Sequence, residues 1–141
     1  MRSSPAGYSG TPLAKKLGIK PGDTVVLIGA PDFMVKVARD AGASPVVKPD
    51  AKAVRGFVSL AHVFTGKASV LRAALAPLKK AIAPNGMIWV SWPKKAARVP
   101  TDITEDTIRA LALPMDLVDV KVCAVDAVWS GLKLVIRKEK R

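Results

Sequence analysis

The sequence predicts an α/β domain in which helices cover both faces of a mostly parallel β-sheet. Two apolar runs without alternation, residues 24–29 and 57–64, have the character of strands that are buried on both faces. A helical pattern follows each run, so strand and helix alternate along the chain. Near the end, residues 118–124 and 132–136 alternate between apolar and polar side chains, which predicts an antiparallel hairpin. Together these patterns predict a three-layer, Rossmann-like fold that a C-terminal antiparallel hairpin closes.

The first third of the chain predicts a short helix, a strand and a second helix. Thr11 is a suitable N-cap, Pro12 fits the first helical position, and Gly18 can end this helix in a left-handed conformation. The β-branched run 24–29 is the first predicted strand. Apolar residues at helical spacing then occupy residues 32–42, where Gly42 ends the pattern.

The middle of the chain predicts one edge strand, one central strand and a long helix. Residues 46–47 could form a short strand, which the prolines on either side would confine to a sheet edge. In the strand 57–64, His62 is the only histidine, so we expect it to be packed and hydrogen-bonded, and no metal site is expected. The helix after it carries an apolar stripe that ends at Ile82. Pro77 lies inside this helix and predicts a kink or a restart.

The last elements are a central strand, a helix and the hairpin. A turn at residues 84–86 leads into a buried strand that stops at the charged segment 93–95. The next helix is expected to be capped by Thr104 and to end at Pro114, with two carboxylates in its first turn, where the helix dipole favours negative charge. In the first hairpin strand, the residues expected to share one face are Val118, Val120, Val122 and Ala124.

Length and composition favour one globular domain in a reducing compartment. At 141 residues, without an internal repeat or a linker, the chain is expected to form a single domain over residues 1–141. Cys123 is the only cysteine, so no intramolecular disulfide can form, and no apolar stretch has the roughly 20 residues of a membrane-spanning helix. The N-terminus lacks the apolar segment of a signal peptide. A cytoplasmic location without membrane contact is therefore expected.

The charge balance is the most distinctive feature of the composition. The chain has 23 Lys and Arg residues against 11 Asp and Glu residues, a net charge of +12, which attracts phosphates, nucleic acids and anionic surfaces. The basic residues are dispersed over the whole chain, as expected for a solvated surface. Aromatic residues interleaved with basic ones are scarce, which argues against a stacking platform for single-stranded nucleic acid.

Two segments resemble S-adenosylmethionine-dependent methyltransferases. The phrase LGIKPGDTVVLIGAP (17–31) is similar to the lead into the first strand of those enzymes, and APNGMIWVSW (83–92) is similar to a later central strand. The resemblance implies a truncated methyltransferase fold, a glycine-rich cofactor loop and an acidic residue after the second strand. Here the loop has one glycine, Gly29, followed by Ala30 and Pro31, and the nearest acidic candidate is Asp50. No cofactor is therefore expected, with S-adenosylmethionine as the alternative.

Three further segments resemble an uncharacterised bacterial family that is known only as a domain of unknown function. They are AGYSGTPLAKKLGIK (6–20), WPKK (92–95) and KVCAVDAVWSGLKLV (121–135). The second lies at the end of the central strand and the third covers most of the predicted hairpin. No activity comes with this resemblance.

The predicted sheet suggests one ligand site at the ends of its central strands. If the strands that end at Gly29, Phe64 and Trp92 are neighbours, the turns after them converge and bring backbone donors and ammonium groups together. The candidate ligand-binding residues are Gly29, Ala30, Thr65, Gly66, Lys67, Trp92, Lys94 and Lys95. The alternative is a set of ordinary turns with solvated lysines, and Asp32 would partly neutralise the site.

The sequence leaves three functions open. The first is a small, non-catalytic binding module for an anionic ligand or partner. The second is a methyltransferase with an atypical cofactor loop, and the third is a basic protein that associates with nucleic acid. No nucleophile motif or catalytic residue is identified, and the ligand and oligomeric state are not predicted.

Overall fold

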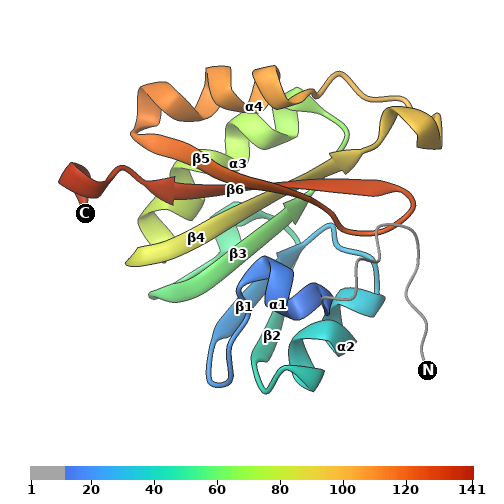
Figure 1. The fold of residues 1–141 in the computed structure, drawn as a ribbon. Helices are drawn as coiled ribbons and strands as arrows, with labels where there is room; N and C mark the ends of the chain where they lie inside the picture. Colours follow the sequence, from blue (N-terminus) through green and yellow to red (C-terminus); the bar gives the residue numbers. More distant parts are fainter. Residues whose placement is uncertain (1–11) are drawn as a thin grey trace.

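A computed structural model describes residues 12–141, and its strands form one six-stranded sheet with the order β2-β1-β3-β4-β6-β5 (Figure 1). The strands are β1 (Thr24–Ile28), β2 (Ser44–Lys48), β3 (Val58–Phe64), β4 (Ile82–Pro93), β5 (Leu117–Ala124) and β6 (Trp129–Ile136). The first four pair in parallel, while β6 is antiparallel to both β4 and β5. The predicted mostly parallel sheet with a C-terminal antiparallel hairpin is therefore confirmed.

Within residues 12–141, four α-helices complete the three layers (Figure 1). They are α1 (Leu13–Leu17), α2 (Phe33–Asp40), α3 (Ala68–Ala81) and α4 (Glu105–Ala112). The core is divided by the sheet into two clusters of buried residues, because successive strand residues point to opposite faces. Val90 of β4 belongs to the cluster that contains Leu75 of α3 and Ile108 of α4. Its neighbour Trp89 belongs to the cluster that contains Leu17 of α1 and Met34 of α2.

The short helix α1 differs in one detail from its prediction. Pro12 lies just before the helix in an extended conformation, and Leu13 is the first helical residue. Pro12 is therefore the N-cap and not the first helical residue as predicted, while the predicted cap Thr11 lies outside the described residues. Gly18 ends the helix with φ +78°, as predicted. The indole N–H of Trp89 donates to the carbonyl of Leu17 at 2.8 Å, which fastens α1 to the sheet.

The connection from α3 to β4 is tighter than the sequence indicates. α3 is one continuous helix through Pro77, so the predicted restart does not occur. β4 begins at Ile82 and contains the predicted turn as an irregularity, since the register with β3 jumps from Ile82 to Met87. A Cβ at Gly86 would lie 3.0 Å from the carbonyl oxygen of Ser59, a tight contact with backbone that glycine avoids at this bend.

The two edge strands behave differently. β2 lies at one edge, as predicted, although it is longer than residues 46–47 and includes Pro45. In β5, at the other edge, the register with β6 shifts between Asp119 and Lys121, so Val120 is an extra residue. Because one extra residue reverses the alternation, Val118 and Val122 lie on opposite faces and the predicted common valine face is wrong. Val120 and Val122 are 53% and 47% exposed.

His62 is packed and hydrogen-bonded inside the sheet layer, as expected. Its side chain is fully buried, stacks on Phe64 with ring centroids 4.1 Å apart, and lies with Nε2 2.7 Å from Oγ of Ser91. Nδ1 has no partner among the described residues. Burial lowers the pKa of His62 to about 3, so the imidazole is neutral at physiological pH.

Candidate ligand-binding site

The sheet order places the three predicted strand ends side by side. β1 pairs with β3, and β3 pairs with β4. The backbone N–H of Thr65 donates to the carbonyl of Ser91 at 3.0 Å, which joins the ends of β3 and β4. Gly29 has φ +66°, and a Cβ there would lie 2.6 Å from the carbonyl oxygen of Phe64. Gly29 is therefore required by contact between strand ends, which accounts for this glycine without a ligand.

A loop from β4 to α4 crosses the turn after β3. The carbonyl of Gly66 accepts hydrogen bonds from Thr101 Oγ1 at 2.8 Å and from the N–H of Asp102 at 3.2 Å. The carboxylate of Asp102 accepts from the N–H of Ala68 at 2.7 Å, at the start of α3. This N–H is therefore not available to a ligand. It is occupied because the N-terminus of a helix favours a negative charge.

Trp92 and Lys95 line a cavity of about 600 Å³ between the end of β4 and the start of α4, which we call the Trp92 cavity. Binding sites for small molecules typically have volumes of about 300–1,000 Å³. Trp92 and Ile103 are largely buried and give the cavity an apolar wall. Its lining residues are Trp92, Pro93, Lys95, Thr101, Ile103, Thr104, Glu105, Asp106 and Arg109.

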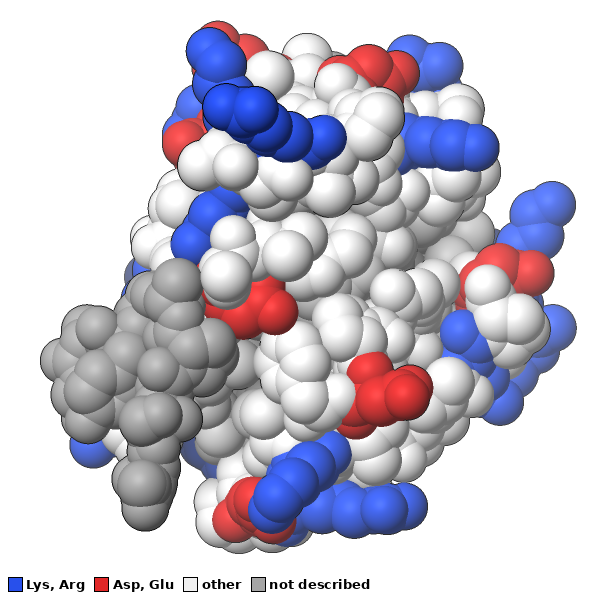
Figure 2. Space-filling model, turned by 90° about the vertical axis from the view of Figure 1, so that its right-hand side faces the viewer, with Lys and Arg blue, Asp and Glu red and all other residues white. Residues whose placement is uncertain are grey.

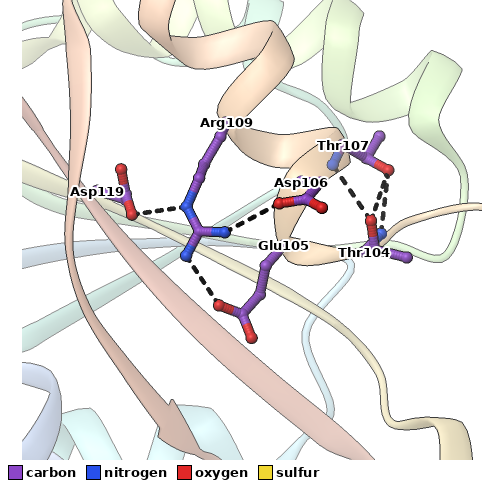
Figure 3. Close-up of polar contacts among 6 residues, drawn as sticks. All are labelled: Thr104, Glu105, Asp106, Thr107, Arg109 and Asp119. Carbon is purple, nitrogen blue, oxygen red and sulfur yellow. Dashed lines mark hydrogen bonds and ion pairs between the residues drawn. The ribbon is translucent and has the colours of Figure 1, made fainter.

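Arg109 holds three carboxylates beside this cavity (Figure 3). Its guanidinium contacts Asp119 of β5 at 2.8 Å, Glu105 at 2.9 Å and Asp106 at 3.2 Å. The hydrogen bond to Asp119 raises the pKa of Arg109, and the same bond lowers the pKa of Asp119. The charge of Arg109 is thus already balanced by its neighbours.

The start of α4 is fixed by a capping box (Figure 3). Thr104 Oγ1 accepts from the N–H of Thr107 at 3.2 Å, and Thr107 Oγ1 accepts from the N–H of Thr104 at 3.1 Å. Thr104 therefore caps the helix, as predicted. The cap also positions Glu105 and Asp106 at the cavity.

The Arg109 cluster was not predicted. From the sequence, the two carboxylates in the first turn of α4, Glu105 and Asp106, are attributed to the helix dipole alone. Their separation of four and three residues from Arg109 is the spacing of side chains that meet on one helix face, so part of the cluster was visible in the sequence. The contact of Asp119 with Arg109 depends on the pairing of β5 with β6, so no pattern in the sequence around Arg109 predicts it.

The structure joins some of the predicted site residues and separates others. Trp92 and Lys95 share the cavity, and the turn 65–67 packs under the loop that borders it. The N–H of Lys94 donates to the carbonyl of Val128 at 2.7 Å, so this loop is fastened to the C-terminal hairpin. Gly29 and Ala30 do not line the Trp92 cavity.

Figure 2 looks onto the side of the molecule where β3 and β4 end. Basic side chains lie toward the edges of this face, and the surface between them is largely uncharged with patches of acidic residues. The positive charge is thus arranged around the face rather than concentrated at its centre.

A second hollow lies where the methyltransferase resemblance places an acidic residue. It has a volume of about 240 Å³, which is below the usual range for a small-molecule site, and it is lined by Ile28, Val63 and Asp50 among others. Asp50 lies two residues beyond the end of β2, and its carboxylate accepts from the N–H of Ala53 at 3.1 Å. At least one of its oxygens is therefore engaged in capping the 3-10 turn Ala51–Ala53.

Within residues 12–141, no three His, Cys, Asp or Glu side chains are grouped so that they could hold a metal ion. Nor does any helix of the described chain have the length and apolarity to cross a membrane.

The fold is similar to that of S-adenosylmethionine-dependent methyltransferases. A ribosomal protein L11 methylase from Lactobacillus delbrueckii subsp. bulgaricus matches with a TM-score of 0.64 and 13% identity, over 89% of this chain and 75% of that chain. A methyltransferase from Aquifex aeolicus matches with a TM-score of 0.62 and 13% identity, over 88% and 87%. Fibrillarin from Aeropyrum pernix, solved with S-adenosyl-L-methionine bound, matches with a TM-score of 0.54 and 15% identity, over 92% and 70%.

No protein-family model and no curated protein sequence matches the chain. At the identities of the structural matches, the likeness defines the fold alone. The chain is thus a protein with a methyltransferase-like Rossmann fold. Its resemblance to the bacterial domain of unknown function stays a prediction.

Proposed function

We propose that the protein is a small cytoplasmic binding module that holds an anionic small molecule, or an anionic group of a partner, in the Trp92 cavity. The observation that carries this proposal is the difference in ion pairing between the two basic residues that line the cavity. Arg109 is engaged with three carboxylates, whereas Lys95 takes part in no ion pair within residues 12–141. Lys95 is thus free to meet a ligand anion beside the apolar wall of Trp92.

The surroundings of Lys95 add to its positive field. Lys94 precedes it, and Arg98 follows in the same loop with φ +57°. Lys67 belongs to the turn that packs under this loop. None of these three residues forms an ion pair in the described part of the chain. A charged hydrogen bond from Lys95 to a ligand is expected to contribute about 1.5–3 kcal/mol.

The carboxylates in the cavity restrict the kind of anion that fits. Glu105 and Asp106 repel a ligand that carries only negative charge, but their oxygens accept hydrogen bonds from hydroxyl groups. A ligand with an anionic group at one end and hydroxyl groups at the other can bind Lys95 with the first and the two carboxylates with the second. Sugar phosphates and hydroxy acids have this chemistry.

The same contacts support binding without catalysis. Asp119, the carboxylate with a lowered pKa, is a weak base and faces Arg109. Glu105 and Asp106 are held by Arg109 as well, and the buried His62 is not among the residues that line the cavity. A general acid or base instead needs a pKa near the working pH.

Calorimetric titration with ribose 5-phosphate and with inorganic phosphate tests this proposal. We expect ribose 5-phosphate to bind more tightly, and Lys95→Ala to weaken its binding by at least about tenfold. Lys80→Ala is the matched control, since Lys80 is also exposed and forms no ion pair within residues 12–141, but it lines a different hollow, next to α3. Equal affinities of the wild type and Lys95→Ala would exclude the Trp92 cavity as the site.

A methyltransferase with an atypical cofactor loop is the second candidate function, and the fold is the observation in its favour. Two structures of this fold, a magnesium protoporphyrin IX methyltransferase and a fibrillarin, were solved with S-adenosylmethionine bound. In this chain, however, the one loop glycine is taken up by the contact with Phe64, and Asp50 caps a turn. Calorimetry with S-adenosylhomocysteine decides between the binding module and the methyltransferase. Measurable binding that Lys95→Ala leaves unchanged supports the methyltransferase. The absence of any binding heat excludes it.

A further inference from the structure

We propose a second anion-binding site, distinct from the Trp92 cavity, in which lysines from the turn after α1 and from the two strands of the C-terminal hairpin bind the adjacent phosphates of an oligophosphate chain. The residues that form this lysine cluster are Lys20, Lys121 and Lys133. They come from three separate parts of the sequence and meet on the face of the sheet that carries α1.

The sheet register sets the position of Lys133. In the β4–β6 pair, Lys133 lies directly opposite Trp89, and side chains of opposite residues lie on the same face. Trp89 is the residue whose indole holds the carbonyl of Leu17 at 2.8 Å, so this face is the one covered by α1. Lys133 is therefore directed toward the α1 side, where it is partly buried.

The next strand brings a second lysine to the same place. Lys121 lies opposite Lys133 in the β5–β6 pair, because the extra residue Val120 reverses the alternation of β5. Its Nζ donates to the carbonyl of Lys16 at 2.9 Å, at the last turn of α1. The irregularity in β5 thus places two like charges on neighbouring strands, where like charges are unfavourable without a partner.

The charges of this cluster repel one another. Burial lowers the pKa of Lys133, and Lys121 and Lys20 lower it further through their positive charges. Lys20, Lys121 and Lys133 form no ion pair within residues 12–141. Asp23, which lies near Lys20 in the chain, accepts from the backbone N–H of Lys20 at 2.9 Å rather than from its ammonium group.

A compact group of phosphates relieves this repulsion. Several ammonium groups that converge on one place suit several negative charges that are equally close together, and lysine binds phosphate as a point charge. No tryptophan, tyrosine or phenylalanine belongs to the cluster, so it offers no stacking surface for bases. These properties favour an oligophosphate over an extended nucleic acid strand.

Isothermal titration with inorganic tripolyphosphate and with ATP at fixed salt tests the site. Lys121→Met with Lys133→Met removes two charges and keeps the apolar stems, and we expect it to weaken tripolyphosphate binding at least about tenfold. The control variant, Lys52→Ala with Lys80→Ala, removes the same charge from the hollow beside α3. It should change the affinity less than twofold. Equal affinities for tripolyphosphate and ATP would show that the phosphate chain alone determines binding. Tighter binding of ATP would show that the phosphate chain is recognised as part of a nucleotide.

A second readout does not depend on the stability of the variant. In the wild type, tripolyphosphate should shift the side-chain NMR signals of Lys133 and Lys121 in a saturable way. Absence of tripolyphosphate binding, or equal losses in the cluster and control variants, would overturn the proposal. Tighter binding of a single-stranded oligonucleotide with losses shared by all lysine variants would do so too. Because Lys94→Ala with Lys95→Ala should leave tripolyphosphate binding intact, failure here is separable from failure of the Trp92 cavity.

Discussion

Acidification should unfold this protein in part through His62. Burial lowers the pKa of His62 to about 3 in the folded protein, whereas in the unfolded chain the pKa is near 6.5. Below pH 6.5 the unfolded chain therefore binds a proton that the folded protein does not, and the free energy of unfolding falls with the pH. At about 1.36 kcal/mol per pH unit, the loss between pH 6.5 and pH 4 is about 3 kcal/mol. Domains are typically stable by only about 5–15 kcal/mol.

Urea unfolding at pH 7, 6, 5 and 4 measures this loss. His62→Leu removes the titrating group, so the free energy of unfolding of the variant should fall less steeply with decreasing pH. The variant should be less stable at pH 7, since Oγ of Ser91 loses its hydrogen-bond partner. That cost does not depend on pH, and the carboxylates titrate alike in both proteins. The difference in slope therefore isolates His62.

Ser91→Ala is the matched control, because it removes the same hydrogen bond but keeps the buried imidazole. It should retain the steep pH dependence of the wild type. If wild type and His62→Leu lose the same free energy between pH 6.5 and pH 4, burial does not hold His62 neutral and the reasoning is refuted.

Two further predictions concern the backbone around the site. Gly29→Ala should cost at least about 2 kcal/mol in urea unfolding, because the new Cβ would meet the carbonyl of Phe64 at φ +66°. Gly22→Ala is its control, because Gly22 has φ +87° but no atom lies within 4 Å of an added Cβ. Its cost should be about 1 kcal/mol. Equal costs for the two variants would contradict a clash between residue 29 and Phe64. Thr104→Ala should lower the free energy of unfolding by about 1 kcal/mol. Adding Thr107→Ala should cost little more, since the two residues form one capping box. Fully additive costs would argue against this shared capping box.

Strong local signals allowed most of the fold to be predicted. Thr24–Ile28 and Val58–Phe64 are mainly apolar runs without alternation, and both are interior strands of the sheet. Gly18 and Thr104 marked helix ends because their roles depend on their own backbone or side chain. In contrast, the register shift that makes Val120 an extra residue depends on how β5 pairs with β6, and no pattern in residues 117–124 predicts it.

The site was predicted less completely because its contacts join distant residues. The neighbouring strand ends followed from the fold class, so Trp92 and Lys95 were identified as candidates. The carboxylate of Asp102 contacts the start of α3 from 34 residues along the chain, and that of Asp119 contacts Arg109 from a different element, β5. They decide which charges remain for a ligand, and only the folded structure brings them there.

The central claim is that the Trp92 cavity binds a hydroxylated anion through Lys95. An NMR titration of the tryptophan indole N–H signals with ribose 5-phosphate tests it most directly, because Trp92 lines the cavity while Trp89 is fully buried against α1. The account predicts a saturable shift of the Trp92 signal, little change at Trp89, and loss of the shift in Lys95→Ala. An unchanged Trp92 signal, or an equal shift in Lys95→Ala, would contradict it.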